Sequence, residues 1–446
     1  MCTIAHPEAP LLPLFAPAFT AATFVRAQLL GVAAILTTGR RTVANLLRTV
    51  ADLTEGDPSS YYRVLSLAQW SGLCLAAILS RFIIRHFWPQ GRIRLVGDDT
   101  VTEHPGRRVH GKARHRDAVR SSHSYTAWRW GHKWVVLAIL VPFPFASRPW
   151  ALPVLVALYR SPQDNQQRGR PHQTPAQLLQ LLVRILRRWF PDREFVLAGD
   201  GGYGSHETAT LARRQAGKVH VVSKFPANAN LYEPPPPYAG KGRPRVKGKK
   251  LPSPQEVVAQ AERTRLNVAW YGGSRRDVEV VSGTGHWYKA GEGLVEVRWV
   301  YVHDLTGTHR DEYFYSTDAT QTPSEIIAEY TGRWNLETTF EEARPYLGLE
   351  STRGWCAPTV LRAEPCLLGL YSVVALMYWL LPAEAQDQRG VAWEGKQSVT
   401  FSDAITAVRR WLWTHWVFPR AGHAEAFAKV PEAFRRLLLY VLAPAA

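Results

Sequence analysis

Acidic residues stand at the ends of two apolar runs and on one helical segment of this 446-residue sequence. Asp98 and Asp99 follow the run "IRLVG", Asp200 follows "EFVLAG", and Glu337 lies in "GRWNLETTFEEARPYLGLE". Carboxylate oxygens are hard ligands that suit Mg²⁺ or Mn²⁺, and these ions keep positions for water and phosphate oxygens. Two ions held by Asp98, Asp200 and Glu337 could activate an attacking oxygen and stabilise a leaving one.

Two elements of different kinds must bring these carboxylates together. The apolar runs before Asp98 and Asp200 have strand length, and strand ends in a mixed sheet are places where side chains converge. Thr322 caps the start of the helix, and Pro323 occupies the first helical position. Glu325 completes a capping box with Thr322, and Pro345 is expected to end the helix. Four of its side chains recur at helical spacing on one face: Tyr330, Arg333, Glu337 and Arg344. The alternative is a solvated stripe with an ion pair between Arg333 and Glu337.

The loop "GDGGYG", residues 199–204, has the G-x-G-x-x-G spacing of a dinucleotide-binding loop and lies between a strand and a helix. Asp200 inside the loop would repel a pyrophosphate, and no acidic residue between Glu207 and Glu233 could bind a ribose. The glycines are therefore better explained as residues that let the chain turn tightly and present Asp200 to the metal ions.

The chain is strongly basic. Lys and Arg number 54 against 37 Asp and Glu, which gives a net charge of +17 and a pI near 9.9. Such a charge favours a polyanionic partner, above all nucleic acid, although a merely soluble basic surface is the alternative. The four cysteines have no paired spacing, so neither a disulfide framework nor a thiolate zinc site is indicated.

The segment from His104 to Lys133 concentrates this charge. It contains Arg107, Arg108, Lys112, Arg114, Arg116, Arg120 and Arg129 with interleaved histidines, His123 among them. The histidine spacing matches no common zinc site. A hairpin that tracks DNA phosphates beside Asp98 is the favoured interpretation, with a solvated basic loop as the alternative. A second basic run, Lys241–Lys250, is either a mobile DNA contact or a solubilising linker.

The pattern along the chain predicts an α/β fold, a mixed-sheet core with a β-rich insertion and helical N- and C-terminal regions. A helix-turn-helix or an ordinary helical hairpin surrounds the turn Glu55–Pro58. The longest apolar stretch, Leu367–Leu381, is shorter than a membrane span, so we expect a buried helix, no membrane association and a cytoplasmic protein. The expected divisions are 1–90 (helical, DNA-binding), 91–225 (core, first part), 226–315 (insertion with a basic Pro/Gly-rich loop), 316–350 (core, second part, with the Glu337 helix) and 351–446 (helical).

The order Asp98, Asp200, Glu337, with the spacing Tyr330-x2-Arg333-x3-Glu337-x6-Arg344, resembles the DDE transposases of bacterial insertion sequences. The resemblance is to the group with a Y-R-E-K signature and a β-strand insertion before the Glu. It spans roughly residues 90–355 and is most specific around 316–350. It implies an RNase H-like core, Mg²⁺, cleavage and rejoining of DNA strands in a cut-and-paste reaction, and a homodimer bound to the terminal inverted repeats of double-stranded DNA in the nucleoid.

The resemblance also implies roles for individual residues. Asp98, Asp200 and Glu337 would hold the two ions, Arg333 and Arg344 would hold phosphates, and Tyr330 would donate a hydrogen bond nearby. Arg344 stands where the family has Lys, and the two side chains are not interchangeable. The first acid is ambiguous, because Asp98 fits the family's Asp-x-Ser/Thr pattern through Thr100 while Asp99 directly precedes that threonine.

Two further alternatives follow from the same resemblance. Trp287 and Trp299 in the insertion could stack on an extruded base, as a tryptophan of related transposases does, or they could be half-buried sheet residues. The whole chain could also be a DNA-binding regulator, or a domesticated relative, that lacks the chemistry. A glycosidase that uses two of the acids is opposed by the basic surface.

Overall fold

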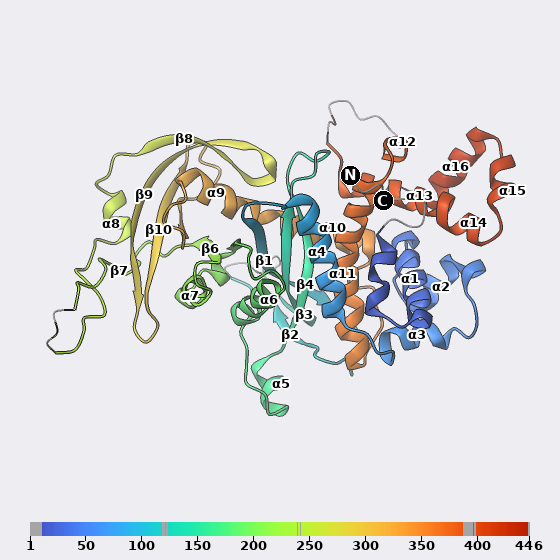
Figure 1. Ribbon diagram of the computed structural model, residues 1–446, viewed down its shortest axis with the longest axis horizontal. Coiled ribbons are helices and arrows are strands. Elements are labelled where there is room, and N and C mark those ends of the chain that lie inside the picture. Colours follow the sequence, from blue (N-terminus) through green and yellow to red (C-terminus); the bar gives the residue numbers. More distant parts are fainter. Residues whose placement is uncertain are drawn as a thin grey trace.

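The protein has a mixed α/β fold, seen in a computed structural model. The model describes residues 11–444 apart from 118–120, 122–123, 239, 241, 387–395 and 397. The core sheet lies between the β-rich insertion at one end of the molecule and the helical terminal regions at the other (Figure 1). The expected fold class is therefore confirmed, whereas the division into functional domains stays a prediction. Arg120, His123 and Lys241 lie outside the described residues.

A single 11-stranded sheet runs through the described residues. Its central five strands follow the order β4-β3-β1-β5-β6, in which β1, β3 and β4 are antiparallel and β1, β5 and β6 are parallel. Their bounds, with that of the short edge strand β2, are β1 (Ile93–Glu103), β2 (Ala113–Arg116), β3 (Trp128–Val141), β4 (Trp150–Tyr159), β5 (Phe195–Gly199) and β6 (Val219–Lys224).

Apolar runs place these strands in the centre of the molecule. Every residue of β5 is buried, and so is β3 from Trp134 onward, as expected for strands covered on both faces. Pro153 is tolerated because β4 pairs only with β3, so that one side of the strand needs no backbone donor. The register between these two strands shifts between Leu137 and Ala138.

The insertion extends the same sheet instead of forming a separate one. β11 pairs with β6, and the sheet continues through the long hairpin of β9 and β10. β7 and β8 both pair with β9. Rigid backbone pairing therefore connects the insertion to the strand next to Asp200. The strands are β7 (Leu231–Tyr232), β8 (Thr264–Ala269), β9 (Arg275–Lys289), β10 (Gly293–Asp304) and β11 (Glu312–Ser316).

Helices cover the two faces of the sheet. On one face α6 packs against β1, β3 and β4, where Leu179 fills the space above Gly97. On the other face α10 packs against β1 and β4, and α9 packs against β5, β6 and β11. The helices of this middle region are α5 (Pro162–Gln167), α6 (Pro175–Trp189), η3 (Gly201–Tyr203), α7 (His206–Arg214), α8 (Pro254–Val258), η4 (Tyr271–Gly273), α9 (Pro323–Gly332) and α10 (Trp334–Leu347).

The two terminal regions are helical, as predicted. The N-terminal helices are η1 (Leu12–Ala18), α1 (Ala21–Leu36), α2 (Val43–Thr49), η2 (Ala51–Leu53), α3 (Ser59–Ser66) and α4 (Gly72–Phe87). The C-terminal helices are α11 (Ala357–Leu380), α12 (Ala383–Gln386), α13 (Phe401–Leu412), the π-helix η5 (Trp413–Val417), α14 (Phe418–Arg420), α15 (Ala424–Lys429) and α16 (Glu432–Leu442). The expected turn at Glu55–Pro58 lies between α2 and α3, and α3 packs on α11 through the buried Tyr61 and Val64. DNA binding by this region stays a prediction.

α11 is the helix in the described residues that is long and apolar enough to cross a membrane by length and composition. It instead packs against β4 and α13, and most of its apolar window is buried inside the molecule. Ser372 donates a hydrogen bond to the backbone oxygen of Pro153 at 2.8 Å, which fixes the helix on the sheet. α11 is therefore a core helix, in agreement with the expectation for this stretch.

The prediction of one unbroken helix from Pro323 to Pro345 is wrong. The helix breaks at Arg333, whose N–H donates to Tyr330 and whose carbonyl accepts from Leu336, both in tight turns. Pro345 lies within the last turn of α10, and the helix ends at Gly348, which adopts a left-handed φ of 64°. The capping box of Thr322 and Glu325 is present.

Candidate active site

Asp98 lies on the face of β1 that α10 covers. Gly97 and Gly199 are the last residues paired across the parallel strands β1 and β5, so Asp98 and Asp200 come directly after this pairing. Asp98 does not end its strand as predicted, because β1 continues to Glu103 and pairs there with β3. Arg333 donates from Nη1 to Asp98 Oδ2 at 2.6 Å and, from the same nitrogen, to Glu337 Oε1 at 2.7 Å. One guanidinium nitrogen therefore brings Asp98 and Glu337 side by side, although they come from opposite parts of the sequence.

Arg333 joins the two helices with right-handed helical dihedral angles, φ −56° and ψ −36°, so Glu337 lies one helical turn further on. Arg333 is both the last cap of α9 and the first cap of α10, and its side chain is almost fully buried. Burial would lower the pKa of Arg333, but the charges of Asp98 and Glu337 outweigh that effect and raise it. Arg333 is therefore a permanent cation that compensates the two carboxylates.

The charge of Asp98 is only partly compensated. Burial raises the pKa of Asp98 to about 7, the negative charges of Asp200 and Asp99 add to the rise, and Arg333 opposes it. The backbone N–H of Asp99 donates to Asp98 Oδ1 at 2.8 Å. The site therefore holds more negative charge than its one arginine can balance, which is the electrostatic condition for attracting a cation.

Asp200 follows β5 and caps the short helix η3. Its Oδ1 accepts the N–H of Gly202 at 2.6 Å, and the turn brings Tyr203 close to Gly199. A Cβ on Gly199 would lie 2.8 Å from Cβ of Tyr203, and one on Gly204 would lie 2.6 Å from the carbonyl oxygen of Lys224. These glycines serve close packing of the turn, consistent with the interpretation that it presents Asp200 instead of cradling a dinucleotide.

Asp99 points to the opposite face of β1 from Asp98, because successive side chains of a strand alternate. Its Oδ1 forms an ion pair with Lys133 Nζ at 2.9 Å, and its Oδ2 accepts a hydrogen bond from the Tyr203 hydroxyl at 2.9 Å. The geometry therefore separates the two candidates for the first acid. Asp98 contacts the ion pair of Arg333 and Glu337, whereas the partners of Asp99 are Lys133 and Tyr203.

The three proposed ligands are of a chemical type that suits a hard divalent ion, but their arrangement does not yet form an ion site. Asp98, Asp200 and Glu337 offer only carboxylate oxygens, the ligands that Mg²⁺ and Mn²⁺ prefer. Among the described residues, however, no three carboxylate, imidazole or thiolate groups are gathered closely enough to enclose a metal ion. Arg333 occupies the space where Asp98 and Glu337 converge, and the guanidinium would have to turn aside for an ion to contact both.

Arg344 and Tyr330, predicted to share the face of Glu337, lie in different surroundings. Arg344 donates from Nη2 to Thr100 Oγ1 at 2.8 Å and from Nε to Glu350 Oε1 at 3.2 Å. Thr100 is on the same face of β1 as Asp98. Tyr330, before the break, is buried and stacks on Phe314 with ring centroids 4.1 Å apart. The Tyr330 ring centroid also lies 5.7 Å from Cζ of Arg333, and the contact of Tyr330 with DNA stays a prediction.

Tyr271 in η4 borders the site and was not found by sequence reasoning. Burial raises the pKa of its hydroxyl to about 12, the charges of Glu312 and Glu337 add to the rise, and Arg333 opposes it. Its ring stacks on His309 with centroids 5.5 Å apart and an interplanar angle of 7°. No sequence motif marks Tyr271, because strand pairing in the insertion carries it toward α10.

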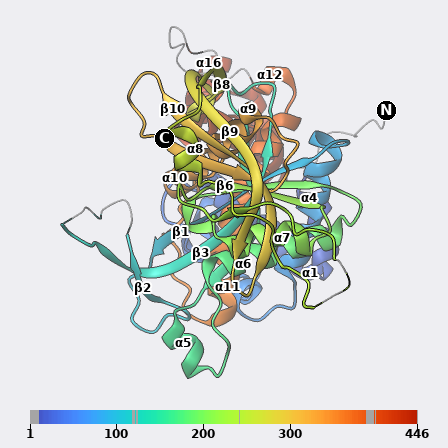
Figure 2. The same ribbon diagram turned by 90° about the vertical axis from the view of Figure 1, so that its left-hand side faces the viewer.

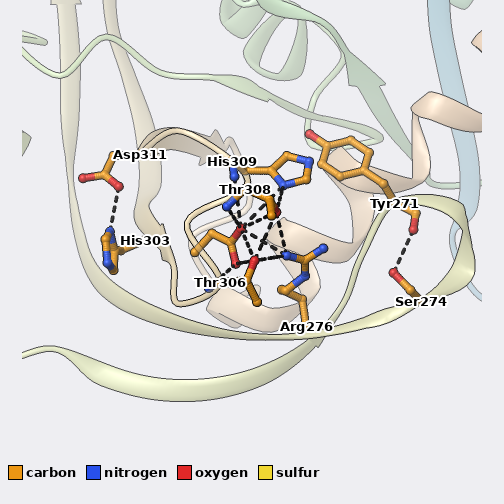
Figure 3. A network of polar contacts seen from close by, with 9 residues as sticks. Tyr271, Ser274, Arg276, His303, Thr306, Thr308, His309 and Asp311 are labelled. Carbon is orange, nitrogen blue, oxygen red and sulfur yellow. Dashed lines mark hydrogen bonds and ion pairs between the residues drawn. The ribbon is translucent and has the colours of Figure 1, made fainter.

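The loop that holds His309 is organised by Asp304 at the end of β10 (Figure 3). The backbone N–H groups of Thr306, Thr308 and His309 donate to the Asp304 carboxylate at 3.1–3.2 Å. Arg276 adds an ion pair at 3.1 Å and also donates to the hydroxyls of Thr306 and Thr308. Burial would raise the pKa of Asp304, but these hydrogen bonds outweigh it and lower the pKa. This carboxylate is therefore a structural support.

The basic segment after β1 reaches the surface as predicted, although its contact with DNA is untested. Arg107 and Arg108 are exposed in the loop after β1, and Arg114 is exposed on β2. Lys112 Nζ donates to the backbone oxygen of Gly106 at 2.7 Å, which helps to fold that loop. Trp287 and Trp299 are buried in the sheet, where Trp287 packs on Phe225, Tyr315 and His206. Of the two alternatives for these tryptophans, the structure favours sheet packing.

Comparison with known proteins identifies a family and similar solved structures. Residues 14–277 match the model of a family described as DDE superfamily endonuclease. This range includes Asp98 and Asp200 and ends before Glu337. No curated protein matches the chain. A cryo-EM structure of piggyBac transposase in a synaptic complex with hairpin DNA is similar with a TM-score of 0.40 and 11% identity, covering 95% of this chain and 75% of that one.

Proposed function

Because this chain belongs to the DDE superfamily endonuclease family, matched over more than half of its length, we propose that it is a DNA transposase that cleaves and transfers DNA strands with divalent metal ions. The proposal rests mainly on one observation. Asp98 and Glu337, which lie far apart in the sequence, meet at a single nitrogen of Arg333 next to the strand end that carries Asp200.

We assign Asp98, Asp200 and Glu337 as the residues that would hold two Mg²⁺ or Mn²⁺ ions. Such ions lower the pKa of a bound water and stabilise charge on the leaving oxygen of a phosphodiester. Paired strands position Asp98 and Asp200, and Glu337 reaches the site from α10 with a side chain that is 41% exposed. Asp99 is left out of the ligand set, since Lys133 and Tyr203 hold it on the other face.

Arg333 has two proposed tasks. Without an ion it compensates the charges of Asp98 and Glu337 and keeps them side by side. When positive charge enters the site, the guanidinium is free to turn toward a DNA phosphate, which it can bind with two parallel hydrogen bonds. Arg344 next to Thr100 is proposed as a second phosphate contact, and Arg107, Arg108, Lys112 and Arg114 as contacts that position the duplex.

The finer features of the reaction are part of the same proposal. They are a cut-and-paste route, terminal inverted repeats as the bound DNA, a homodimer as the active form, a cytoplasmic protein acting on nucleoid DNA, and an origin in a bacterial insertion sequence of the Y-R-E-K group. The basic net charge of +17 supports DNA as the partner. A DNA-binding regulator without the chemistry is the competing function, favoured by the way Arg333 fills the space between two carboxylates.

The deciding experiment substitutes Glu337 by Gln and uses Glu341 as a matched control. Glu341 lies one turn later on the same helix and is exposed. A supercoiled plasmid with the DNA that flanks the gene is incubated with each protein and Mg²⁺ or Mn²⁺, and nicked product is followed on a gel. We expect nicking by wild type and Glu341→Gln and none by Glu337→Gln, while all three shift the flanking DNA in a binding assay.

Two results would count against the proposal. Nicking by Glu337→Gln at the wild-type rate would remove Glu337 from the site. A wild-type protein that binds the flanking DNA but cuts it with neither ion would favour the regulator.

A further inference from the structure

β2 and the first residues of β3 form a two-stranded ribbon at the edge of the sheet, and it projects from the side of the molecule (Figure 2). Arg114 is paired with Trp130 and Arg116 with Trp128, so these four side chains share one face of the ribbon, which we call the outer face. All four are exposed. The opposite face carries His115, which is buried against Tyr159.

The two tryptophans of the outer face are among the three exposed tryptophans of the described residues, the third being Trp355. Trp128 is 49% exposed and Trp130 is 60% exposed, whereas Trp287 and Trp299 are buried. The guanidinium of Arg114 lies 4.7 Å from the ring centre of Trp128, and Lys112 Nζ lies 5.9 Å from that of Trp130. Cations over the rings help to hold them in place, and large apolar rings at a surface mark a binding site.

The charge on this ribbon is divided between its two faces. Arg129, on the inner side, forms ion pairs with Asp117 at 2.6 Å and with Glu103 at 3.2 Å. The acidic residues of the ribbon are thus engaged on the inner side, and the outer face presents Arg114 and Arg116 beside the two tryptophans. A surface that combines flat aromatic rings with guanidinium groups is complementary to a nucleic acid.

A chain of contacts connects the ribbon to the candidate active site. Arg344, which bonds to Thr100 next to Asp98, also bonds to Glu350, and Glu350 lies 3.8 Å from Nη1 of Arg129 in the ribbon. β3 pairs with β1 and, from Trp128 to Gly131, with β2, so the ribbon shares a strand with the neighbour of Asp98. The contacts reach the inner side of the ribbon through Arg129, and the outer face lies on the other side of the same two strands.

We propose that the outer face binds unpaired bases of a DNA strand by stacking them on Trp128 and Trp130, while Arg114, Arg116 and Lys112 hold the phosphates of the same strand. The inference rests on the proposed function, because it names the form of DNA that this site takes. In a duplex both faces of each base are covered by neighbouring bases, so exposed tryptophans gain little from it. An unpaired base offers a free π-face, and this holds for every base type.

The test compares binding of single-stranded and double-stranded DNA without metal ions, so that cleavage plays no part. A fluorescein-labelled thymidine oligomer and a duplex of the same length are titrated in EDTA with wild type and Trp128→Ala/Trp130→Ala, and anisotropy gives the affinities. We expect the double variant to bind the single strand at least about tenfold more weakly and the duplex less than about twofold more weakly. Trp128→Phe/Trp130→Phe, which keeps aromatic rings, should bind almost as wild type.

A second readout reports stacking directly. A duplex with one unpaired 2-aminopurine should lose fluorescence on binding wild type, because stacking on an indole quenches the base, and should keep it with the double alanine variant. Phe434→Ala removes an exposed aromatic ring from α16, in the C-terminal helical region at one end of the molecule, and should change neither measurement. If Trp128→Ala/Trp130→Ala does not fold, Trp128→Leu/Trp130→Leu replaces it and is compared with Trp128→Phe/Trp130→Phe.

Either of two results would overturn the inference. Equal losses on both DNA forms would mean that the ribbon only tracks phosphates, and equal affinities of all variants would mean that it does not bind DNA. The proposed function fails separately. A protein whose tryptophans select unpaired bases but which never nicks DNA would contradict the active site alone, and a protein that nicks but ignores these substitutions would contradict the ribbon alone.

Discussion

Asp98 and Asp304 are both aspartates withdrawn from solvent on strands of the same sheet, yet their surroundings differ in almost every respect. The side chain of Asp98 is 14% exposed and that of Asp304 is 1% exposed. Asp304 accepts hydrogen bonds from three backbone N–H groups, from two threonine hydroxyls and from Arg276. Asp98 has Arg333 and a single backbone N–H.

The difference appears in the protonation of the two groups. Hydrogen bonds to the charged form lower the pKa of Asp304 in spite of its burial, whereas burial and neighbouring carboxylates raise the pKa of Asp98 to about 7. A carboxylate whose donors are all supplied by its own loop stabilises that loop. A carboxylate left short of donors beside Asp200 and Glu337 destabilises the fold but is available to a ligand, and this separation of roles can be tested.

The largest effect should come from removing the charge of Asp98. Asp98→Asn keeps the shape of the side chain but weakens any metal ligand at this position, so we expect plasmid nicking to fall by about a thousandfold, equivalent to roughly 4 kcal/mol in the barrier. The free energy of unfolding should stay the same or increase, because a poorly compensated charge is removed. Initial rates of nicking and urea denaturation measure the two quantities.

Asp99→Asn is the matched control for this prediction. Asp99 is the adjacent residue on the same strand but faces Lys133 and Tyr203. We expect the nicking rate to stay within about threefold of wild type, because the loss of a contact outside the site should change the barrier by no more than about 0.6 kcal/mol. If Asp99→Asn abolished nicking and Asp98→Asn did not, the assignment of the first acid would be reversed.

Removing Asp304 should have the next largest effect, and on stability instead of chemistry. Asp304→Ala leaves Arg276 and three backbone N–H groups without their acceptor, and we expect the free energy of unfolding to fall by about 3 kcal/mol. Nicking per folded molecule should change little. Asp277→Ala, which removes an exposed carboxylate from the same insertion, should cost much less than Asp304→Ala. Equal costs for the two substitutions would mean that the Asp304 loop contributes no special stability.

Opposite pKa shifts give the two carboxylates opposite pH dependences. Because the pKa of Asp98 is raised to about 7 in the folded state, its contribution to stability is present at acid pH and is lost as the pH rises toward 7. The pKa of Asp304 is lowered, so its contribution is constant above its unfolded pKa and is lost only in acid.

Urea denaturation in EDTA at pH 5 and pH 8 tests this contrast. Relative to Asp98→Asn, wild type should lose roughly 2 kcal/mol of its free energy of unfolding between these two values. Relative to Asp304→Ala it should lose almost nothing over the same range. A wild-type advantage over Asp98→Asn that grew with pH would contradict the raised pKa of Asp98.

Local patterns in the sequence predicted most of the elements. Apolar runs of strand length correspond to β1, β3, β4, β5 and β6, and the capping box at Thr322 starts α9. The break at Arg333 was not predictable in this way, because both halves of the segment have helical spacing and the break is set by tertiary contacts. Likewise, alternating polarity predicted strands in the insertion but carried no information on which core strand they would extend, and β11 pairs with β6.

The candidate site shows the same limit. The i,i+4 spacing of Arg333 and Glu337 indicated an ion pair as the alternative to a site, and the apolar runs before Asp98 and Asp200 pair as the parallel strands β1 and β5. The contact between Arg333 and Asp98 joins residues that are 235 positions apart and has no local signal. Exposure was the least predictable property, since tryptophans in alternating strands are buried at Trp299 and exposed at Trp130. Which residues act in catalysis stays a prediction from sequence and geometry alike.

The smallest effect concerns Arg344, which lies on the same side of the sheet as Asp98. The family that the chain resembles has Lys at this position. Arg344 spans two partners, Thr100 and Glu350, with different nitrogens of its guanidinium. A lysine keeps the charge but has one nitrogen, so Arg344→Lys should lose one contact and lower nicking by about fivefold, or roughly 1 kcal/mol. Arg353→Lys, at an exposed arginine nearby, should leave the rate unchanged. A loss as large as that of Asp98→Asn would instead place the guanidinium directly on the reacting phosphate.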